Sequence, residues 1–181
     1  MAGIDETRTF VPVRIAILTV SDTRGLEDDT SGDLLVNRLT EAGHRLADRA
    51  IVRDEPADIR ALVKRWAADP EVDAVITTGG TGLTGRDVTP EALRPLFEKE
   101  IDGFSALMHM ISFQKVGTST VQSRSLGGVI NGTYVFCVPG SPGACRDAWD
   151  GILKLQLDAR HRPCNFVEIM PRLQEHLRPS K

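Results

Sequence analysis

A glycine- and threonine-rich segment has the clearest chemical character in this sequence of 181 residues. It covers residues 77–90 (TTGGTGLTGRDVTP), follows an apolar run at residues 74–76, and precedes a segment with helical spacing of apolar side chains. A strand, a glycine loop and a helix in this order can place a phosphate on the backbone N–H groups at the helix N-terminus. Glycine also lets the backbone approach an anion closely, because it has no Cβ atom. The segment therefore predicts a phosphate-binding loop.

Arg86 and Asp87 add side-chain chemistry to this loop. Arg86 offers a guanidinium group to a phosphate, whereas the Asp87 carboxylate would repel one unless a proton or a metal such as Mg²⁺ lay between them. The alternative is a plain glycine-rich turn in which Asp87 lies near a helix cap. The combination of the glycines with Asp87, Thr89 and Pro90 favours phosphate binding.

Two further loops follow predicted strands. Ser21 and Asp22 come directly after the apolar run at residues 13–20, and a Pro-Gly-Ser-Pro-Gly loop at residues 139–143 follows the run at residues 134–138. Ligands of open α/β sheets bind at the carboxyl ends of the strands. We therefore expect both loops to face the glycine loop and to form walls of the same site.

Several polar residues near these loops have a structural alternative. Residues 28–31 (DDTS) can cap the helix that follows them, and the acids at 54 and 55 can cap the helix that begins near Pro56. Arg124 lies between two serines in the polar segment 117–128, an arrangement that suits an oxyanion. A solvated loop is the alternative for that segment.

The elements around these loops alternate between strands and helices. Apolar, β-branched runs predict strands at residues 13–20, 44–52 and 73–78, with amphipathic helices after each of them. Such alternation predicts a parallel sheet with right-handed crossovers and helices on both faces. The expected fold class is thus α/β, a single domain of three α/β/α layers around a mostly parallel central sheet.

Local signals predict where individual elements begin and end. Thr89-Pro90 and Ser141-Pro142 each read as an N-cap followed by proline at the first helical position. Asp102-Gly103 is expected to end the helix after Pro90, and Asn131-Gly132 predicts a hairpin at the sheet edge or a turn into a central strand. The apolar stripe within residues 104–111 fits either the core or a subunit contact.

Composition limits the function classes. The net charge of −3 gives no general attraction to nucleic acid or membranes, and three unpaired cysteines suit a reducing cytoplasm. The glycine loop lacks the lysine of a P-loop, and the first strand is not followed by the glycine pattern of a Rossmann site. His161 and Cys164 are too few for a structural zinc site. We expect a flexible arm at residues 1–12, the domain at 13–173 and a tail at 174–181.

The motifs together resemble the MoaB/MogA family of molybdenum cofactor biosynthesis, over roughly residues 10–173. The resemblance depends on TTGGTG followed by RDVTP, with support from Ser21-Asp22, Ser123-Arg124 and the loop at residues 139–142. Length and the ending near residue 168 look closer to MoaB. The family implies a molybdopterin-binding fold, binding of molybdopterin (a pterin with a dithiolene and a terminal phosphate), and assembly into homotrimers or homohexamers.

The resemblance also implies residue roles. Asp54 and Asp87 match acids that the family assigns to catalysis and to binding of Mg²⁺ and the nucleotide. The matching substrate-binding positions are Ser21, Asp22, Thr78, Gly79, Gly80, Thr81, Gly82, Thr89, Ser123, Arg124, Pro139, Gly140, Ser141 and Pro142.

The implied reaction joins the pterin phosphate to ATP with Mg²⁺, giving adenylyl-molybdopterin and pyrophosphate. A pterin carrier without chemistry is the alternative. A further, weaker alternative is a general nucleotide-binding α/β protein of another pathway. The molybdate-inserting enzyme is the implied partner.

Overall fold

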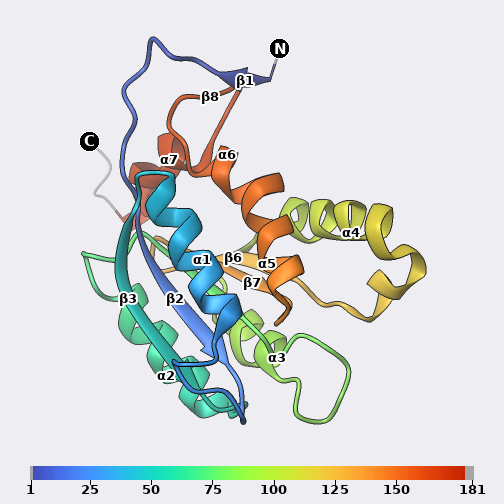
Figure 1. Cartoon of the computed structure of the whole chain (residues 1–181). Helices are drawn as coiled ribbons and strands as arrows, with labels where there is room; N and C mark the ends of the chain where they lie inside the picture. The colour runs from blue at the N-terminus through green and yellow to red at the C-terminus, as the bar shows by residue number, and fades with distance from the viewer. Residues whose placement is uncertain (1, 178–181) are drawn as a thin grey trace.

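The computed structural model describes residues 2–177 and has a six-stranded sheet at its centre (Figure 1). The strands lie in the order β3-β2-β4-β7-β6-β5. Their bounds are β2 Arg14–Val20, β3 Arg45–Val52, β4 Ala74–Thr78, β5 Lys99–Glu100, β6 Leu126–Ile130 and β7 Thr133–Val138. The four strands from β3 to β7 run parallel, and β6 is antiparallel to both β7 and β5. The mostly parallel sheet confirms the predicted α/β class.

Side chains of the parallel strands alternate between two hydrophobic clusters, as expected for a sheet buried on both faces. Ile15 and Ile17 belong to the first cluster, whereas Ala16 and Leu18 belong to the second. The first face is covered by α1 (Thr30–Glu41), α4 (Asp102–Val116), α5 (Pro142–Ala148) and the π-helical turn η3 (Trp149–Leu153), which continues into α6 (Lys154–Gln156). The second is covered by α2 (Pro56–Ala67) and α3 (Thr89–Leu93). The three predicted layers are confirmed.

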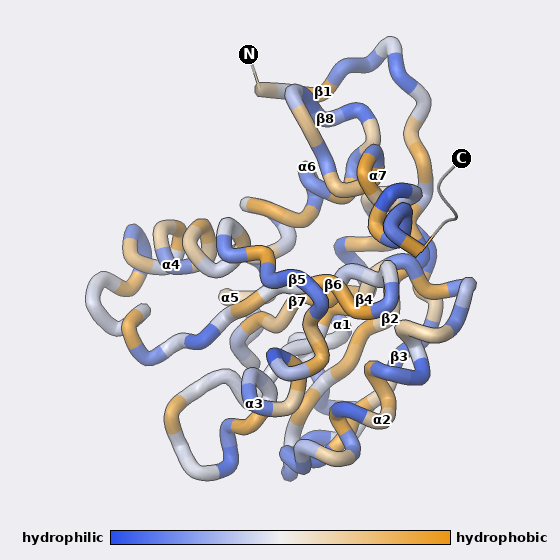
Figure 2. Tube along the Cα trace, turned by 180° about the vertical axis from the view of Figure 1, so that it is seen from behind, coloured by the Kyte–Doolittle hydropathy of each residue, from blue (hydrophilic) through white to orange (hydrophobic). Residues whose placement is uncertain are grey.

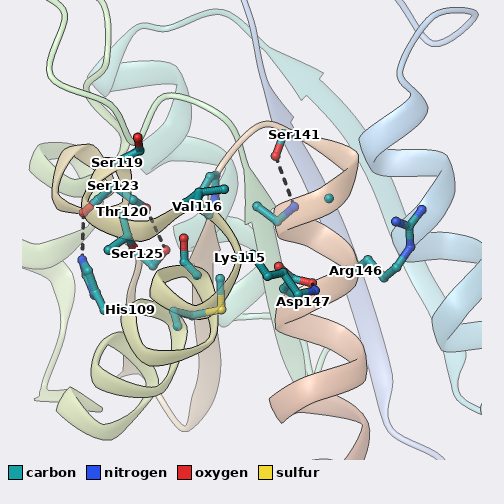
Figure 3. Close-up of a pocket in the computed structure, with 15 residues that line it drawn as sticks. His109, Lys115, Val116, Ser119, Thr120, Ser123, Ser125, Ser141, Arg146 and Asp147 are labelled. Carbon is teal, nitrogen blue, oxygen red and sulfur yellow. Dashed lines mark hydrogen bonds and ion pairs between the residues drawn. The ribbon is translucent and has the colours of Figure 1, made fainter.

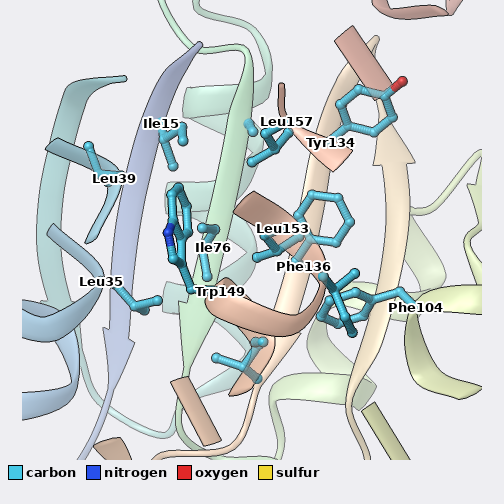
Figure 4. Close-up of a cluster of buried hydrophobic side chains, with 14 of the residues drawn as sticks. Ile15, Leu35, Leu39, Ile76, Phe104, Tyr134, Phe136, Trp149, Leu153 and Leu157 are labelled. Atoms are coloured by element: carbon cyan, nitrogen blue, oxygen red, sulfur yellow. The ribbon is translucent and has the colours of Figure 1, made fainter. Parts of the chain in front are cut away.

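The first cluster is centred on Trp149, which is 1% exposed and lies beside Ile76 of the sheet (Figure 4). The strands β4 and β6 are among the most hydrophobic segments of the trace (Figure 2). Within residues 2–177, no helix has the length and apolar character that crossing a bilayer requires.

Two predicted helix starts are confirmed in detail. Ser141 caps α5 by accepting a hydrogen bond from the Ala144 N–H at 3.1 Å, with Pro142 at the first position. Asp29 caps α1 through the Gly32 N–H at 2.9 Å, so the capping alternative holds for Asp29. Buried Asp29 also accepts from the Thr19 hydroxyl and pairs with Arg49, which ties α1 to two strands.

The N-cap predicted at residue 54 or 55 is confirmed in position, because Glu55 occupies it, although Glu55 makes no side-chain cap bond. Two other predicted helix ends are wrong. Thr89 is the first residue of α3 rather than its cap, because its hydroxyl donates to the Gly79 carbonyl at 2.9 Å instead. The helix after Pro90 already ends at Leu93, followed by the 3₁₀ turn η1 (Arg94–Leu96) and β5. Asp102 begins α4, so the prediction that Asp102-Gly103 ends the preceding helix is wrong.

The hairpin signal at Asn131-Gly132 is confirmed. Both residues have positive φ angles, 48° and 78°, and they join antiparallel β6 to the central strand β7. Both alternatives considered from the sequence therefore apply in part, since β7 is central while β6 lies one strand from the edge.

The N-terminal segment, expected to be a loose arm, is tied to the C-terminal segment. Strand β1 (Gly3–Ile4) pairs antiparallel with β8 (His161–Arg162), and Arg8 forms an ion pair with Glu168. The expected tail begins within short helical turns, α7 (Phe166–Ile169), η4 (Met170–Arg172) and η5 (Glu175–Leu177). Residues 178–181 lie outside the described residues, and the domain boundaries at 12 and 173 stay predictions.

Buried His44 predicts a pH-dependent stability. It is 5% exposed between Phe10 and Trp149 and accepts a hydrogen bond from the Val13 N–H at 3.1 Å. Burial lowers the pKa of His44 from 6.5 to about 4. His44 therefore binds a proton more readily in the unfolded chain than in the folded protein. The free energy of unfolding is unaffected above pH 6.5, the pKa of His44 in the unfolded chain, and it falls as the pH drops toward about 4, the pKa in the folded protein. The total loss is about 3 kcal/mol, of which about 2 kcal/mol is lost by about pH 5.

The test is urea unfolding at about pH 7.5 and about pH 5, where wild type and His44→Gln are compared. Glutamine keeps an acceptor for Val13 but does not titrate, so its stability should fall by about 2 kcal/mol less than that of wild type. The control is His176→Gln at an exposed position, which should follow wild type. Equal pH dependence of His44→Gln and wild type would contradict the assignment.

Candidate active site

The carboxyl ends of β2, β3, β4 and β7 meet at one edge of the sheet. The loop after β2 leads to α1 on the first face, whereas the loop after β4 leads to α3 on the second face. Loops that diverge in this way leave a crevice between neighbouring strands. Of the predicted site residues, Ser21 and Asp22 follow β2, Asp54 follows β3, Gly79 to Gly82 follow β4, and Pro139 to Pro142 follow β7. The structure thus brings these four groups to the same edge.

The start of the glycine loop packs directly on neighbouring backbone. Gly79 has a φ of +101°, and a Cβ atom there would lie 2.2 Å from the Val20 carbonyl oxygen. A Cβ atom on Gly140 would lie 3.1 Å from the Gly79 Cα atom, so the loops after β4 and β7 are in backbone contact. The Gly79 N–H donates to the Val138 carbonyl at 3.2 Å.

The next two N–H groups, those of Gly80 and Thr81, have no hydrogen-bond acceptor among residues 2–177. Thr81 is only 4% exposed. Unpaired N–H groups are costly when buried, and two in succession after a strand form the kind of cradle in which an anion binds.

Threonine hydroxyls hold this loop in place. Thr78 Oγ1 donates to the Pro139 carbonyl at 3.0 Å, and Thr89 Oγ1 donates to the Gly79 carbonyl. Both threonines are fully buried. Ser31 Oγ and Arg24 Nη1 donate to the Gly140 carbonyl at 3.0 and 3.2 Å. The roles of Ser31 and Arg24 could not be predicted from the sequence, because their residue types carry no signal of such a contact.

Arg124 has partners within the chain. Its Nε donates to the Gly82 carbonyl at 2.8 Å, its Nη2 donates to the Asp87 carbonyl at 2.9 Å, and its Nη1 pairs with Glu91. Its backbone N–H donates to the Thr81 carbonyl at 3.1 Å. Arg124 therefore supports the glycine loop from behind. A direct contact between Arg124 and an oxyanion stays a prediction.

Arg86 is likewise engaged by acids. Its Nε and Nη2 donate to the two carboxylate oxygens of Asp22, both at 2.9 Å, and its Nη1 donates to Glu55 at 2.9 Å. Asp22 also accepts from the Asp54 N–H at 3.2 Å. The loops after β2, β3 and β4 are thus joined by one guanidinium group. Ser21 caps the β2 loop by accepting from the N–H groups of residues 23 and 24.

The two predicted catalytic acids are in different electrostatic surroundings. Burial raises the pKa of Asp54, and the neighbouring Asp22 and Asp87 carboxylates add to this effect. In contrast, the hydrogen bond from the Thr84 hydroxyl to Asp87 Oδ2, 2.6 Å long, lowers the pKa of Asp87. Neighbouring carboxylates whose pKa values are shifted in opposite directions are typical of catalytic sites.

The acids fit a magnesium ion that shares its ligands with a substrate. Among residues 2–177, no group of three or more His, Cys, Asp and Glu side chains could hold a metal ion by itself. Magnesium in proteins is commonly held by one or two carboxylates together with substrate phosphates and water. Asp54 receives no hydrogen bond from any side chain of the described residues, and like-charged neighbours disfavour its ionised form. A cation beside Asp54 and Asp87 would relieve that repulsion.

A cavity of about 410 Å³ lies on the other side of the Pro139–Pro142 loop, between α4, the 3₁₀ helix η2 (Gly117–Gln122) and α5 (Figure 3). Hydroxyl groups dominate its polar lining. The lining includes the predicted residues Ser123, Pro139 and Ser141, together with Ser112, Ser119, Thr120, Ser125, His109, Lys115, Arg146 and Asp147. The hydroxyl residues of the segment 117–125 could be predicted as site candidates from the sequence. The polar residues that α4 contributes to the cavity could not, because the apolar stripe of that helix dominated its pattern.

Thr120 marks this cavity as a place for a ligand. It is 8% exposed, and its Oγ1 atom has no hydrogen-bond partner among the described residues. Because buried hydroxyl groups are nearly always paired, a polar group of a bound molecule is a natural partner for Thr120.

Comparison with known proteins identifies the family. The model described as "Probable molybdopterin binding domain" matches residues 16–159. The molybdenum cofactor biosynthesis protein B of Escherichia coli K12 is 55% identical over 157 residues, 87% of this chain and 92% of the relative. The chain belongs to the MoaB/MogA family of molybdenum cofactor biosynthesis. The Bacillus subtilis protein of the same name is 44% identical over 142 residues, 78% of this chain and 84% of the relative.

A solved structure agrees with the MoaB/MogA assignment. The crystal structure of a molybdenum cofactor biosynthesis protein B matches with a TM-score of 0.83 at 40% identity, covering 93% of this chain and 99% of that one. The family resemblance predicted from TTGGTG and RDVTP is therefore confirmed, and the site described above lies in a molybdopterin-binding fold.

Gly79 allows a test of the loop packing. Gly79→Ala should lower the free energy of unfolding by about 3 kcal/mol, because alanine would need both a positive φ and space that the Val20 carbonyl occupies. Gly85→Ala in the same loop is the matched control, since a Cβ atom there meets nothing within 4 Å; it should change stability by less than about 0.5 kcal/mol. Urea unfolding measures both, and equal stabilities of the two variants would contradict the packing.

Proposed function

We propose that the chain binds molybdopterin and transfers an adenylyl group from Mg-ATP to its terminal phosphate, with release of pyrophosphate. The proposal rests on two kinds of group that lie at the same edge of the sheet. The loop N–H groups of Gly80 and Thr81 have no acceptor among the described residues, and the pKa values of the Asp54 and Asp87 carboxyl groups are shifted in opposite directions. Joining two phosphates requires groups that position the phosphates and groups that neutralise their negative charge. The N–H groups can position a phosphate, and the carboxylates can hold the metal ion that neutralises charge.

Each part of the site has a task in this proposal. The N–H groups of Gly80 and Thr81 bind a phosphate. The Thr89 hydroxyl holds the glycine loop by its Gly79 carbonyl, and the Thr78 hydroxyl holds the neighbouring loop by its Pro139 carbonyl. The hydroxyl-lined cavity takes the pterin, with Ser123, Pro139 and Ser141 in its wall. The Pro139–Pro142 loop borders both regions, so a pterin in the cavity can direct its phosphate toward the glycine loop.

Asp54 and Asp87 are the acids on which turnover depends. Bound Mg²⁺ would neutralise charge on the ATP phosphates during the displacement. Asp87, held ionised by Thr84, is suited to hold that ion, and Asp54 to hold the ion or the nucleotide. Asp22 has less freedom, because both of its carboxylate oxygens are paired with Arg86.

A pterin carrier is the second candidate, and one observation favours it. Asp87 Oδ2 also accepts from the Thr84 N–H at 2.9 Å, so Asp87 stabilises the turn at residues 84–87. A carrier would need that turn and the cavity without any adenylyl transfer. The two candidates therefore differ in what the acids do and agree on pterin binding.

We further propose that the chain forms homotrimers or homohexamers through α4. Large apolar side chains on α4 and η2 are exposed, with Leu107 at 45%, Met110 at 61%, Phe113 at 58%, Val116 at 54% and Val121 at 75%. Exposed apolar groups gathered in this way are typical of protein interfaces.

The assembly is tested by light scattering after size exclusion. Phe113→Glu should shift the chain toward monomer, because a buried, unpaired carboxylate opposes association. Gln114→Glu on the same helix, at an exposed position, adds the same charge and should leave the mass unchanged. A wild-type chain that is monomeric would exclude the assembly.

The reaction is tested by anaerobic incubation with molybdopterin, ATP and Mg²⁺, scoring pyrophosphate and adenylyl-molybdopterin. Asp87→Asn should lower the rate about 100-fold or more, while pterin binding changes little. An asparagine amide oxygen can still accept from Thr84, so the loop should remain intact. Asp54→Asn should also lose activity. Asp58→Asn, an exposed acid in the first turn of α2, is the control and should retain it.

The other outcomes separate the candidates. Tight pterin binding without product would make the chain a carrier. If the wild-type chain neither binds the pterin nor forms product, the proposed function fails altogether.

A further inference from the structure

Arg86 lies between two acids that belong to neighbouring loops. Its Nε and Nη2 atoms donate to the two carboxylate oxygens of Asp22, and its Nη1 atom donates to Glu55 Oε1. Ion pairs between exposed side chains usually add little to stability, but a bidentate pair within a network is the exception. Arg86 therefore has a defined place, although 56% of its side chain is exposed.

The two carboxylates of the proposed reaction lie against the glycine loop. A Cβ atom on Gly80 would lie 3.0 Å from Asp54 Oδ1, and a Cβ atom on Gly82 would lie 2.8 Å from Asp87 Oδ2. Asp54 and Asp87 thus contact parts of the loop that are two residues apart. Because a shared ion or nucleotide must reach both carboxylates, the distance between them matters for the reaction.

Asp87 is fixed within its own loop. Its Oδ2 atom accepts from both the hydroxyl and the N–H group of Thr84, and its backbone N–H donates to the Thr84 carbonyl at 3.1 Å. Its carbonyl accepts from Arg124. None of these bonds involves the side chain of Arg86, so Asp87 can keep its place without it.

The chain around Asp54 is held by Arg86 instead. No side chain of the described residues donates a hydrogen bond to the Asp54 carboxylate, whose hydrogen-bonding neighbour is the backbone of Asp22. The Asp54 N–H donates to Asp22 Oδ1 at 3.2 Å, and the same oxygen accepts from Arg86 Nη2. The next residue, Glu55, accepts from Arg86 Nη1. Arg86 thus connects Asp54 to the glycine loop through both Asp22 and Glu55.

We propose that Arg86 is a positioning residue that holds Asp54 in place relative to Asp87, rather than a ligand of a substrate phosphate. Arg86 directly precedes Asp87 in the glycine loop, and its guanidinium group reaches the loops after β2 and β3. The planar guanidinium group can bind two carboxylates at fixed angles, which the single ammonium group of lysine cannot do. The effect on turnover rests on the proposed function, whereas the placement of Asp54 does not.

Amide hydrogen exchange of the ligand-free chain, followed by NMR at a single pH, tests the placement. In Arg86→Gln, exchange of the Asp54 N–H should become about tenfold faster, because Asp22 is released and one hydrogen bond to a charged acceptor is lost. The Thr84 N–H donates to Asp87 and should exchange as in wild type. Arg86→Lys should resemble Arg86→Gln at Asp54, since lysine keeps the charge but not the two-sided pairing.

A double-mutant cycle tests the consequence for turnover. Arg86→Gln and Asp22→Asn should each lower the rate of pyrophosphate release about tenfold, and the double variant should be no slower than either, because both changes break the same connection. Pterin affinity of Arg86→Gln should change little, since the hydroxyl-lined cavity does not include Arg86.

Arg94→Gln is the matched control for both measurements. Arg94 is also an exposed arginine paired with an acid, with 59% of its side chain exposed and Glu100 at 2.7 Å. It lies on η1, away from the loops that Arg86 joins. Its substitution should leave both the rate of pyrophosphate release and the exchange of the Asp54 N–H unchanged.

Two results would overturn the proposal. One is unchanged exchange of the Asp54 N–H in Arg86→Gln. The other is a double variant whose loss of rate is the product of the two single losses, as expected if Arg86 bound a phosphate independently of Asp22. If the wild-type chain forms no product, the proposed function fails, and exchange of the Asp54 N–H still decides the placement.

Discussion

The backbone of Gly79 lies against the backbone of Gly140, and this contact fixes the two loops that form the centre of the site. A Cβ atom at Gly79 would meet the Val20 carbonyl oxygen, so the contact depends on glycine. The hydroxyl groups of Ser31, Thr78 and Thr89 donate to the loop carbonyls around this contact. The N–H groups of Gly80 and Thr81 have no acceptor among the described residues. The two unpaired N–H groups, which suit the proposed phosphate, thus result from the close approach of the ends of two strands rather than from any one charged residue.

Both arginines at this edge of the sheet, Arg86 and Arg124, are paired with acids of the protein. Arg86 pairs with Asp22 and Glu55, and Arg124 pairs with Glu91 while donating to loop carbonyls. Burial raises the pKa of Asp54, the neighbouring Asp22 and Asp87 carboxylates add to this effect, and no side chain of the described residues donates a hydrogen bond to Asp54. The arginines therefore set the shape of the loops, and the uncompensated charge is concentrated where a substrate and its metal ion would bind.

The sequence predicted the parts of the molecule that depend on local patterns. Apolar runs and helical spacing predicted the layers, Asn131-Gly132 predicted the hairpin, and the strand-end loops were expected to meet because strand ends of a parallel sheet meet. The misreadings came from tertiary partners that outcompeted local preferences. Thr89 could cap a helix but bonds Gly79 instead. The contact of Arg124 with an oxyanion stays a prediction, and the carbonyl partners of its side chain could not be seen in the sequence.

The two edge strands of the sheet bear on how copies of this chain can meet. The edge strand β5 is two residues long, and both of them, Lys99 and Glu100, are charged and exposed. The other edge strand, β3, is eight residues long and exposes the charged Arg45 and Asp48 beside Leu46 and Ala47. Short strands and charged side chains at a sheet edge discourage pairing with the strands of another molecule. Both edges therefore oppose growth of the sheet across subunits, β5 through its length and charge and β3 through its charged side chains. The proposed assembly through α4 does not extend the sheet, so it would leave the strand-end site of each copy clear of a shared sheet.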